Sequence, residues 1–436
     1  MPPNNPLPNR DRQGADLAPR APQADPRRLL IVATKLGYQT RLMGDIAKRL
    51  GVNVSLATDR CHILEDPWGD QAIPVHFDAL EESALQVATG RVFDAIVAVD
   101  DRPAYLAALI AEQAGVLFHP SAAAHAATNK FEARECFRRA GLLVPAYQRW
   151  PADADPSALA GVARYPCVLK PLGLSASRGV IRANAPAEFI TAFLRIRRLL
   201  QTPELARLRD PSMDYIQMED FLPGRELALE GVVTNGRLHV LALFDKPDPL
   251  DGPYFQETIY VTPSRELEPV QQRIFQAAQQ AVTALGLTQG PVHAEMRVSG
   301  EQVWILEVAP RPIGGLCAKA LVFTDDMPLE EVIVRHALGE DVSRMVRRDG
   351  AAGVMMIPVP RPGIYQGASG LAAAQAIADE VILTAKEGQR MQPLPEGNTY
   401  LGFLFVWDKS PAIVESRLRQ AHEALQFHIA ETLPVV

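Results

Sequence analysis

Two acidic residues and an arginine lie close together in a stretch of strand-prone sequence. Glu295 and Glu307 flank a short turn at 299–301, and Arg311 follows four residues after the second acid. The residues around both acids are mainly of types enriched in β-strands, so we expect a β-hairpin. Both carboxylates would then be held in a sheet.

The register of this hairpin decides whether the two carboxylates can act together. A two-residue loop would put the acids on opposite faces, because side chains alternate along a strand. A three-residue loop with Gly300 in the left-handed conformation pairs Val298 with Gln302 and brings both acids and His293 onto one face. We predict this second register. Facing carboxylates repel unless a proton or cation lies between them, and a divalent ion is common near phosphates. On these strands alone, a solvated hairpin is an equally good interpretation.

Composition limits the kind of partner. The chain has 436 residues, of which 47% are hydrophobic, so it can hold two to four packed units. Its formal net charge of -7 argues against nucleic-acid and acidic-membrane partners, since both require clustered positive charge. No apolar run approaches the roughly 18 to 20 residues of a membrane span. The four cysteines are far apart and form no zinc or disulfide pattern, which favours reduced thiols in a cytoplasmic protein.

The chain divides into a tail and three units. Residues 1–26 are rich in polar residues and proline, which predicts a disordered tail. Residues 27–120 alternate strands with helices, which predicts an open parallel α/β domain, with a loop at 36–44. Its first turn lacks the GxGxxG spacing of a dinucleotide site. A second unit covers 121–345, and a small α+β domain covers 346–436. The strands predicted in the first unit are 28–33, 52–57 and 95–99, the last ending in the acidic pair Asp100 and Asp101.

A lysine and a loop of small residues suggest phosphate binding. Lys170 ends an apolar strand at 165–171, and an interior-facing lysine needs an anionic partner. The loop that follows has backbone and hydroxyl groups able to contact phosphate oxygens, although it is not a Walker loop. Taken alone, an ordinary turn explains it better, and Lys130 near a helix start would usually face solvent. The loop residues that we single out are Gly173, Ser175, Ser177 and Gly179.

The segment 219–226 reads EDFLPGRE and offers exposed backbone at a turn between strands. Its last carboxylate, Glu226, is suited to binding two vicinal hydroxyls, although an ordinary surface turn is the favoured interpretation of this segment taken alone. Further along, Asn235 and Gly236 predict a tight hairpin. An amphipathic helix is predicted at 268–285, and it leads to the first hairpin.

In this order, the motifs resemble the ATP-grasp superfamily, whose nucleotide lies between two sheet-containing lobes. The resemblance is dense from Asn129 to Gly315 and architectural outside that span. It implies an ATP-grasp fold of the α/β and α+β classes, with the ATP-grasp domain at 121–345 and a flexible lid lobe near 155–225. The trailing domain is similar to the one found in biotin-carboxylase-like members.

The resemblance also implies residue roles. Glu295 and Glu307 would hold Mg²⁺, with Mn²⁺ as an alternative, and Arg311 would steady the reacting phosphate as the catalytic residue. The family commonly has Asn two residues after the second acid, but this chain has Ala309, which puts a second metal ion in doubt. Water or Glu257 would have to complete the shell. The ATP contacts implied are Lys130, Lys170, Gly173, Ser175, Ser177, Gly179, Glu219, Phe221, Leu222 and Glu226.

The implied reaction is ATP-dependent activation of a carboxylate as an acyl phosphate, followed by attack of an amine. The arrangement is similar to carboxylate-amine ligases that join amino acids, including L-amino-acid ligases. The partners would be small carboxylates and amines, and a homodimer is compatible with this class. Alternatives are a biotin-carboxylase-like or purine-pathway ligase, or a non-catalytic nucleotide-binding protein. The candidate substrate residues are Lys246, Glu257, His293, Gly314 and Gly315, and a buried core position is an equal alternative for the histidine.

Overall fold

The computed structural model describes residues 26–34, 36–61 and 63–431, so the predicted tail lies almost wholly outside the described residues. The first unit is a parallel sheet with strand order β3-β2-β1-β4. The prediction of an open parallel α/β unit is confirmed. Its elements are β1 (Arg28–Ala33), α1 (Tyr38–Arg49), β2 (Asn53–Thr58), β3 (Ala72–Pro74), α2 (Leu80–Ala88), β4 (Ala95–Val99) and α3 (Asp101–Ala114).

The predicted loop at 36–44 is wrong, because α1 already begins at Tyr38. Gln39 and Thr40 are buried on this helix, 5% and 1% exposed. Polar residues at buried positions hide the apolar periodicity by which a helix is recognised in a sequence. The first turn of α1 therefore packs inward.

Two short helices lead from the first unit to a lid. They are α4 (Ser121–Thr128) and α5 (Lys130–Arg139). Asn129 caps α5, since its side chain accepts hydrogen bonds from the backbone N–H groups of Phe131 and Glu132. This cap places Lys130 in the first turn of the helix, beside the site described below.

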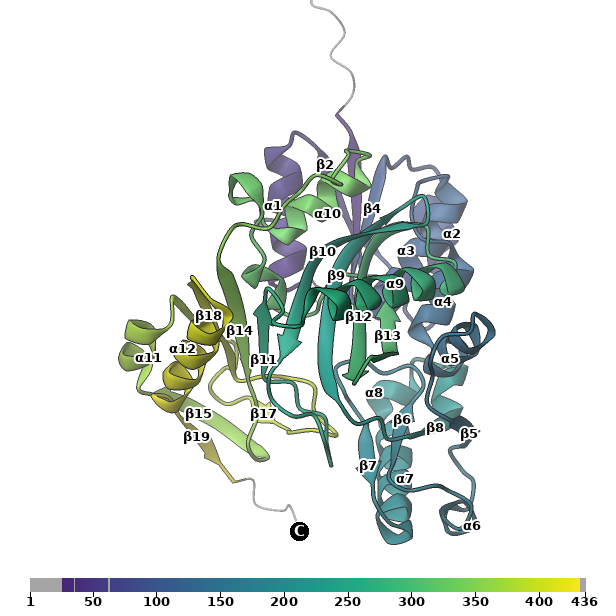
Figure 1. Ribbon diagram of the computed structural model, residues 1–436. Helices are drawn as coiled ribbons and strands as arrows, with labels where there is room; N and C mark the ends of the chain where they lie inside the picture. Colours follow the sequence, from purple (N-terminus) through teal and green to yellow (C-terminus); the bar gives the residue numbers. More distant parts are fainter. Residues whose placement is uncertain (1–25, 35, 62, 432–436) are drawn as a thin grey trace, which may run out of the picture.

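The lid is a four-stranded antiparallel sheet with strand order β5-β8-β6-β7. One long helix, α7, packs on this sheet, and the two form a separate hydrophobic core. The lid projects from the rest of the molecule (Figure 1). Its elements are β5 (Tyr147–Pro151), α6 (Pro156–Ala160), β6 (Cys167–Pro171), β7 (Ile181–Ala183), α7 (Pro186–Leu200), α8 (Pro203–Ala206) and β8 (Tyr215–Asp220).

An eight-stranded sheet forms the centre of the molecule, in the order β13-β12-β9-β10-β11-β14-β18-β16. Asn235 and Gly236 turn between β9 and β10 with φ of 51° and 79°, as the hairpin motif predicts. Strands β11 and β14 pair directly, so the C-terminal unit continues the same sheet. The strands are β9 (Arg225–Thr234), β10 (Arg237–Lys246), β11 (Ile259–Thr262), β12 (Gln289–Ser299), β13 (Gln302–Ala309), β14 (Ala351–Ile357), β16 (Glu380–Leu383) and β18 (Gly402–Asp408).

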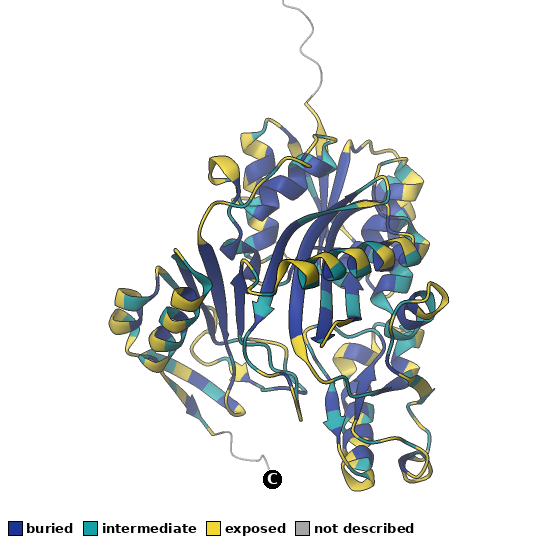
Figure 2. Ribbon diagram, in the orientation of Figure 1, coloured by how far each residue is buried: buried dark blue, intermediate teal, exposed yellow. Residues whose placement is uncertain are grey.

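The two faces of this sheet have different neighbours. One face packs against α9 and α12, whose apolar residues share cores with it. The other face packs against the first unit and α10, leaving room for a cavity. The central strands are almost entirely buried, whereas the outer sides of the covering helices are exposed (Figure 2). The covering helices are α9 (Glu268–Leu285), α10 (Leu329–Ala337) and α12 (Pro411–Glu423), and the first of these has its predicted bounds.

A small antiparallel sheet, in the order β17-β15-β19, completes the C-terminal unit. Its elements are β15 (Gly363–Ser369), α11 (Leu371–Ile377), β17 (Arg390–Met391) and β19 (Gln426–Ala430). Within the described residues, we find no helix long and apolar enough to cross a bilayer.

Candidate active site

A cavity of about 500 Å³ lies between the lid, the central sheet and both flanking units. Most residues singled out from the sequence line it, whereas Gly173, Gly179 and Lys246 lie outside its lining. The residues that line it are Lys130, Lys170, Ser175, Ser177, Glu219, Phe221, Leu222, Glu226, Glu257, His293, Glu295, Glu307, Arg311, Gly314 and Gly315. The fold therefore gathers residues from 130 to 315 around one space.

Strand alternation explains why ionisable side chains gather on the cavity floor. Arg297 on β12 pairs with Glu226 on β9, which in turn pairs with Lys246 on β10. Directly paired residues point to the same face, and so do residues two apart on one strand, such as Glu295 and Arg297. The apolar residues between them, such as Leu227, point to the opposite face and pack in the α9 core.

The hairpin of β12 and β13 brings the two predicted acids together by a different register from the one expected. Ser299 pairs with Gln302 and Val298 with Val303, so the predicted pairing of Val298 with Gln302 is wrong. A β-bulge between Glu295 and Met296 shifts the pairing, and Glu295 then faces Glu307 directly. The shared face of the two acids was predicted, but it depends on the bulge, because the turn register alone would place them on opposite faces.

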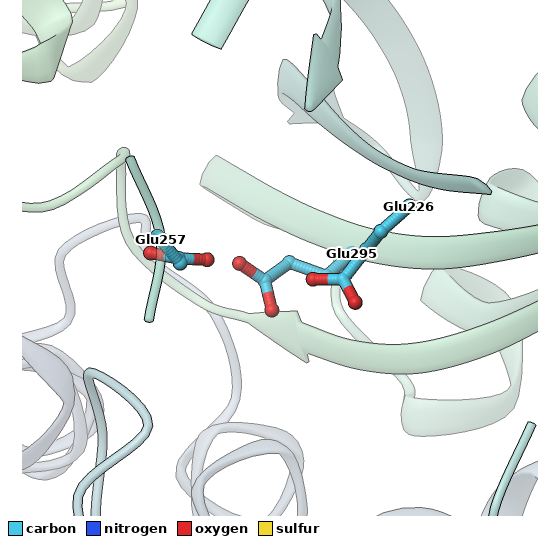
Figure 3. A group of neighbouring side chains, drawn as sticks. All are labelled: Glu226, Glu257 and Glu295. Atoms are coloured by element: carbon cyan, nitrogen blue, oxygen red, sulfur yellow. The ribbon is translucent and has the colours of Figure 1, made fainter. Parts of the chain in front are cut away.

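Lys246 lies among three carboxylates. Its Nζ atom is 2.9 Å from a carboxylate oxygen of Glu226, 2.5 Å from Glu257 and 2.9 Å from Glu295. These three acids come from separate segments and point toward one another (Figure 3). Burial lowers the pKa of Lys246, but the carboxylates outweigh it and raise that pKa well above its ordinary value. Lys246 is 7% exposed, so this cation is buried.

The carboxylates also fit a divalent ion. Ligand oxygens of Glu226, Glu257 and Glu295 all lie within 4.8 Å of one another, and oxygen donors of this kind suit Mg²⁺. Glu307 faces Glu295 across the hairpin, and its carboxylate is 3.4 Å from Nζ of Lys130. Lys246 already lies beside Glu295, and Lys130 beside Glu307. A metal ion would therefore neutralise these carboxylates together with the two lysines.

Lys170 pairs with a buried carboxylate. Its Nζ atom donates to Glu219 at 2.6 Å, and Arg134 donates to the same carboxylate at 2.7 Å. Burial raises the pKa of Glu219, but the two cations lower it to about 2. The sequence analysis did not single out Arg134, which is 1% exposed, because no local pattern marks a charged helix residue as buried. Glu219 thus fixes the position of the Lys170 ammonium.

The segment 219–226 joins the lid to the central sheet. The backbone N–H of Phe221 donates to Pro166 in the lid, and the carbonyl of Leu222 accepts from Arg297 at 2.6 Å. Arg297 also donates to Glu226 at 3.0 Å. The sequence reading missed Arg297, although its position two residues after Glu295 placed it on the same face.

Arg311 reaches across to the first unit. Its guanidinium donates to both carboxylate oxygens of Asp101, at 2.7 and 3.2 Å. Burial lowers the pKa of Arg311, but Asp101 raises it further above its ordinary value, so the side chain stays charged. The sequence analysis named the acidic pair that follows the strand 95–99 without giving it a role. In the structure Asp101 is the first residue of α3, and it orients the arginine.

His293 belongs to a buried network. Nδ1 of His293 contacts Glu230, whose other oxygen accepts the backbone N–H of Ile313 at 3.1 Å. Burial lowers the pKa of His293, but Glu230 and Glu295 outweigh it and raise that pKa to about 9. Gln39 donates to the carbonyl of Ile313 at 2.9 Å, so this network also holds the start of the Gly314-Gly315 segment. The sequence reading missed Glu230 and Gln39.

The loop 172–179 contacts the C-terminal unit. The backbone N–H of Gly179 donates to the carbonyl of Pro395 at 2.8 Å, and Nε of Arg178 donates to the carbonyl of Glu396 at 2.9 Å. Gly179 has a φ of 75°, and a Cβ atom there would lie 2.7 Å from Pro171. Its glycine is thus required by backbone geometry and packing. Ser175 and Ser177 line the cavity.

Comparison with known proteins identifies two parts of the chain. Residues 163–320 match the model of the ATP-grasp domain, and residues 355–430 match that of the L-amino acid ligase C-terminal domain 2. The prediction of an ATP-grasp domain is therefore confirmed. For the C-terminal unit, the resemblance implied a domain similar to that of biotin-carboxylase-like members, and the model that matches it is that of an L-amino acid ligase domain. Uncharacterized protein y4rH of Sinorhizobium fredii is 23% identical over 307 residues, which cover 69% of this chain and 61% of that protein.

Solved structures confirm the fold. The L-amino acid ligase from Bacillus licheniformis has a TM-score of 0.76 at 22% identity, covering 94% of this chain and all of that chain. Phosphoribosylglycinamide synthetase from Anaerococcus prevotii has a TM-score of 0.66 at 16% identity, covering 93% and 100%. Biotin carboxylase from Campylobacter jejuni has a TM-score of 0.64 at 16% identity, covering 92% of each chain. Identities this low show a common architecture.

Proposed function

We propose that this ATP-grasp protein is an ATP-dependent carboxylate-amine ligase that joins amino acids through an acyl phosphate and releases ADP and phosphate. The observation that carries the proposal is the cavity itself. It brings Lys130 and Lys170, the facing acids Glu295 and Glu307, and Arg311 around one space, as phosphoryl transfer to a carboxylate requires.

The first step transfers the terminal phosphoryl group. A carboxylate oxygen of the acyl substrate forms a bond to the γ-phosphorus, and the bond from that phosphorus to the β,γ-bridging oxygen breaks to release ADP. Lys130 and Lys170 offset the negative charge of the phosphates. For this, the Lys170 ammonium would turn from the Glu219 carboxylate, to which it donates, toward the phosphate oxygens. A divalent ion bound by Glu295 and Glu307 would supply further neutralisation of the phosphoryl charge.

The second step forms the amide bond. The amine nitrogen bonds to the acyl carbon, the bond from that carbon to the phosphate oxygen breaks, and inorganic phosphate leaves. Arg311, held by Asp101, stabilises the oxyanion of the tetrahedral intermediate. The amine must lose a proton, and Glu257 is suited to accept it, because burial raises the pKa of this carboxyl above its ordinary value.

The test is phosphate release by the purified full chain with ATP and Mg²⁺, measured with pooled amino acids, with bicarbonate and with a ribosyl amine. Release that depends on amino acids, together with a peptide product identified by mass spectrometry, is the expected result. Release triggered by bicarbonate or the ribosyl amine alone would instead favour a biotin-carboxylase-like or purine-pathway ligase. Failure of every substrate would favour a nucleotide-binding protein without catalysis.

A further inference from the structure

One wall of the cavity comes from the C-terminal unit, and we name it the C-terminal wall. It consists of Met356, Thr384, Asn398, Thr399, Tyr400 and Phe403. None of these six side chains carries a charge at neutral pH, and burial raises the pKa of Tyr400 still further above its ordinary value. The wall thus differs from the charged floor, whose side chains Glu226, Glu295 and Arg297 come from β9 and β12.

The C-terminal wall is far from the lid hinge along the sheet. This hinge, residues 219–226, is bound by Arg297 on β12 and ends at Glu226 on β9, whereas Met356 is on β14 and Phe403 on β18. Three strands separate β12 from β14, which corresponds to about 19 Å at the usual strand spacing. The hinge and the wall are therefore too far apart to contact the same group of a bound molecule. If ATP binds at the hinge, the wall remains available to a second molecule.

The wall has the shape and chemistry of a side-chain pocket. Met356 pairs with Phe403 on the cavity face of the sheet, and the rings of Tyr400 and Phe403 have centroids 5.9 Å apart. Gly315 closes one side, because a Cβ atom at this residue would lie 3.5 Å from the Phe403 ring. Apolar and aromatic surfaces of this kind bind an apolar group by removing it from water.

Groups for the two ends of an amino acid lie next to this wall. Glu257 raises the pKa of Tyr400 by proximity and accepts a hydrogen bond from Tyr260 at 2.8 Å. Its carboxylate is placed for an ammonium group. Backbone N–H groups at Gly314 and Gly315 are suited to a carboxylate. A phosphoribosyl group would need cations on the wall, and its six residues supply none.

We propose that the C-terminal wall receives the side chain of one amino-acid substrate, and that this side chain is bulky and apolar. The proposal rests on the ligase function proposed above and names its substrate class. A leucine, methionine or phenylalanine side chain would lie against Met356 and Phe403. An aspartate or lysine side chain would lose its hydration there without gaining a charged partner.

The experiment measures phosphate release by the full chain with single amino acids. Leucine, methionine and phenylalanine should exceed aspartate, lysine and serine in kcat/KM by about tenfold or more. Met356→Ala and Phe403→Leu should reduce this preference by about tenfold. Phe405→Leu is the matched control, because Phe405 lies on the same strand and face and stacks on Phe403, but does not line the cavity. The control should keep the preference.

The outcomes separate the two proposals. Equal release with polar and apolar amino acids would leave the ligase function intact and overturn the apolar pocket, as would an equal loss of preference in Phe405→Leu. If no amino acid triggers release, the ligase function fails. Calorimetry of leucine and aspartate against the chain with a non-hydrolysable ATP analogue then decides the pocket. Tighter binding of leucine supports it, whereas equal or absent binding overturns it.

Discussion

At the residue scale, the charges of the site compensate one another in pairs and triads. Lys246 joins three carboxylates, Glu219 joins two cations, and Asp101 holds Arg311. Buried charges are tolerated only when paired, so the loss of one partner leaves its neighbours uncompensated. ATP and a metal ion would add negative and positive charge to these paired groups. Replacing Lys246 or Glu307 tests how far the site depends on the pairing.

Lys246→Met removes the cation at the centre of three carboxylates. We expect the free energy of unfolding to fall by about 3–5 kcal/mol, because the acids then repel one another. Millimolar Mg²⁺ or Mn²⁺ should restore part of the lost melting temperature, since a divalent ion can take the same position. Arg265→Met is the control, because Arg265 is exposed and forms an ion pair with Asp245, the neighbour of Lys246 on β10. It should cost less than about 1 kcal/mol. Equal losses in the two variants, without rescue by metal, would contradict this account.

Glu307→Gln keeps the size of the side chain but removes its charge opposite Glu295. We expect kcat for phosphate release to fall by about two orders of magnitude or more, because the site loses a metal-binding carboxylate at the reacting phosphate. Calorimetry should still detect nucleotide binding. Glu301→Gln, at the exposed turn of the same hairpin, is the control and should retain turnover. Unchanged turnover in the Glu307 variant would sink the ligase mechanism.

At the scale of elements, the lid is held to the C-terminal unit. Arg195 on α7 forms a two-pronged ion pair with Glu396, with one contact at 2.8 Å, and contacts Tyr254 as well. Nε of Arg178 and the backbone N–H of Gly179 donate to the carbonyls of Glu396 and Pro395 in the same segment. The loop 172–179 of the lid is therefore held in place by the C-terminal unit.

Glu396→Ala should loosen the lid. We expect faster amide hydrogen exchange in residues 172–184 and unchanged exchange in β1 and β4, because the lost ion pair joins the lid to the C-terminal unit and does not involve the first unit. Glu204→Ala is the control: Glu204 pairs with Arg178 within the lid itself at 3.2 Å and is largely exposed. An exchange pattern identical in both variants would show that the C-terminal segment does not hold the lid.

At the scale of the whole molecule, the units share one sheet and one cavity. The pairing of β11 with β14 joins the ATP-grasp strands to the C-terminal strands, and α10 packs the first unit onto the cavity face of the sheet. A buried acid lies in this junction. Burial raises the pKa of Glu330 on α10 to about 7, and Glu230 adds to the rise.

The cytoplasmic location and the homodimer stay predictions.

Glu330 makes stability depend on pH. Its pKa in the folded chain, about 7, exceeds its value of 4.5 in the unfolded chain, so the folded state binds more protons between these values. Stability should therefore be greatest below about pH 4.5 for this group, and fall as the pH rises to about 7. Glu330→Gln should remove the decrease, which is worth about 3 kcal/mol, in denaturant unfolding followed from pH 5 to 8. Glu340→Gln is the control and should keep the decrease in stability, because Glu340 is more exposed than Glu330.

Local sequence signals predicted much of the framework. The bounds of β1, β4 and α9 follow from continuous apolar runs and helical periodicity, and Asn235-Gly236 specifies its own turn. The order of Lys130, Lys170, Glu226, Glu295 and Glu307 indicated the ATP-grasp domain. These features depend on residues near in the chain, where period and turn chemistry act directly.

Tertiary structure decided what distant residues do to one another. The bulge that puts Glu295 opposite Glu307 depends on how β12 packs between β9 and β13, and no turn residue announces it. Arg311 meets Asp101, which lies 210 residues earlier in the chain. The sequence by itself thus determined which chemical groups are present and on which strands. Only the folded chain decided which charges are paired, because pairing across a sheet and between units has no local signal.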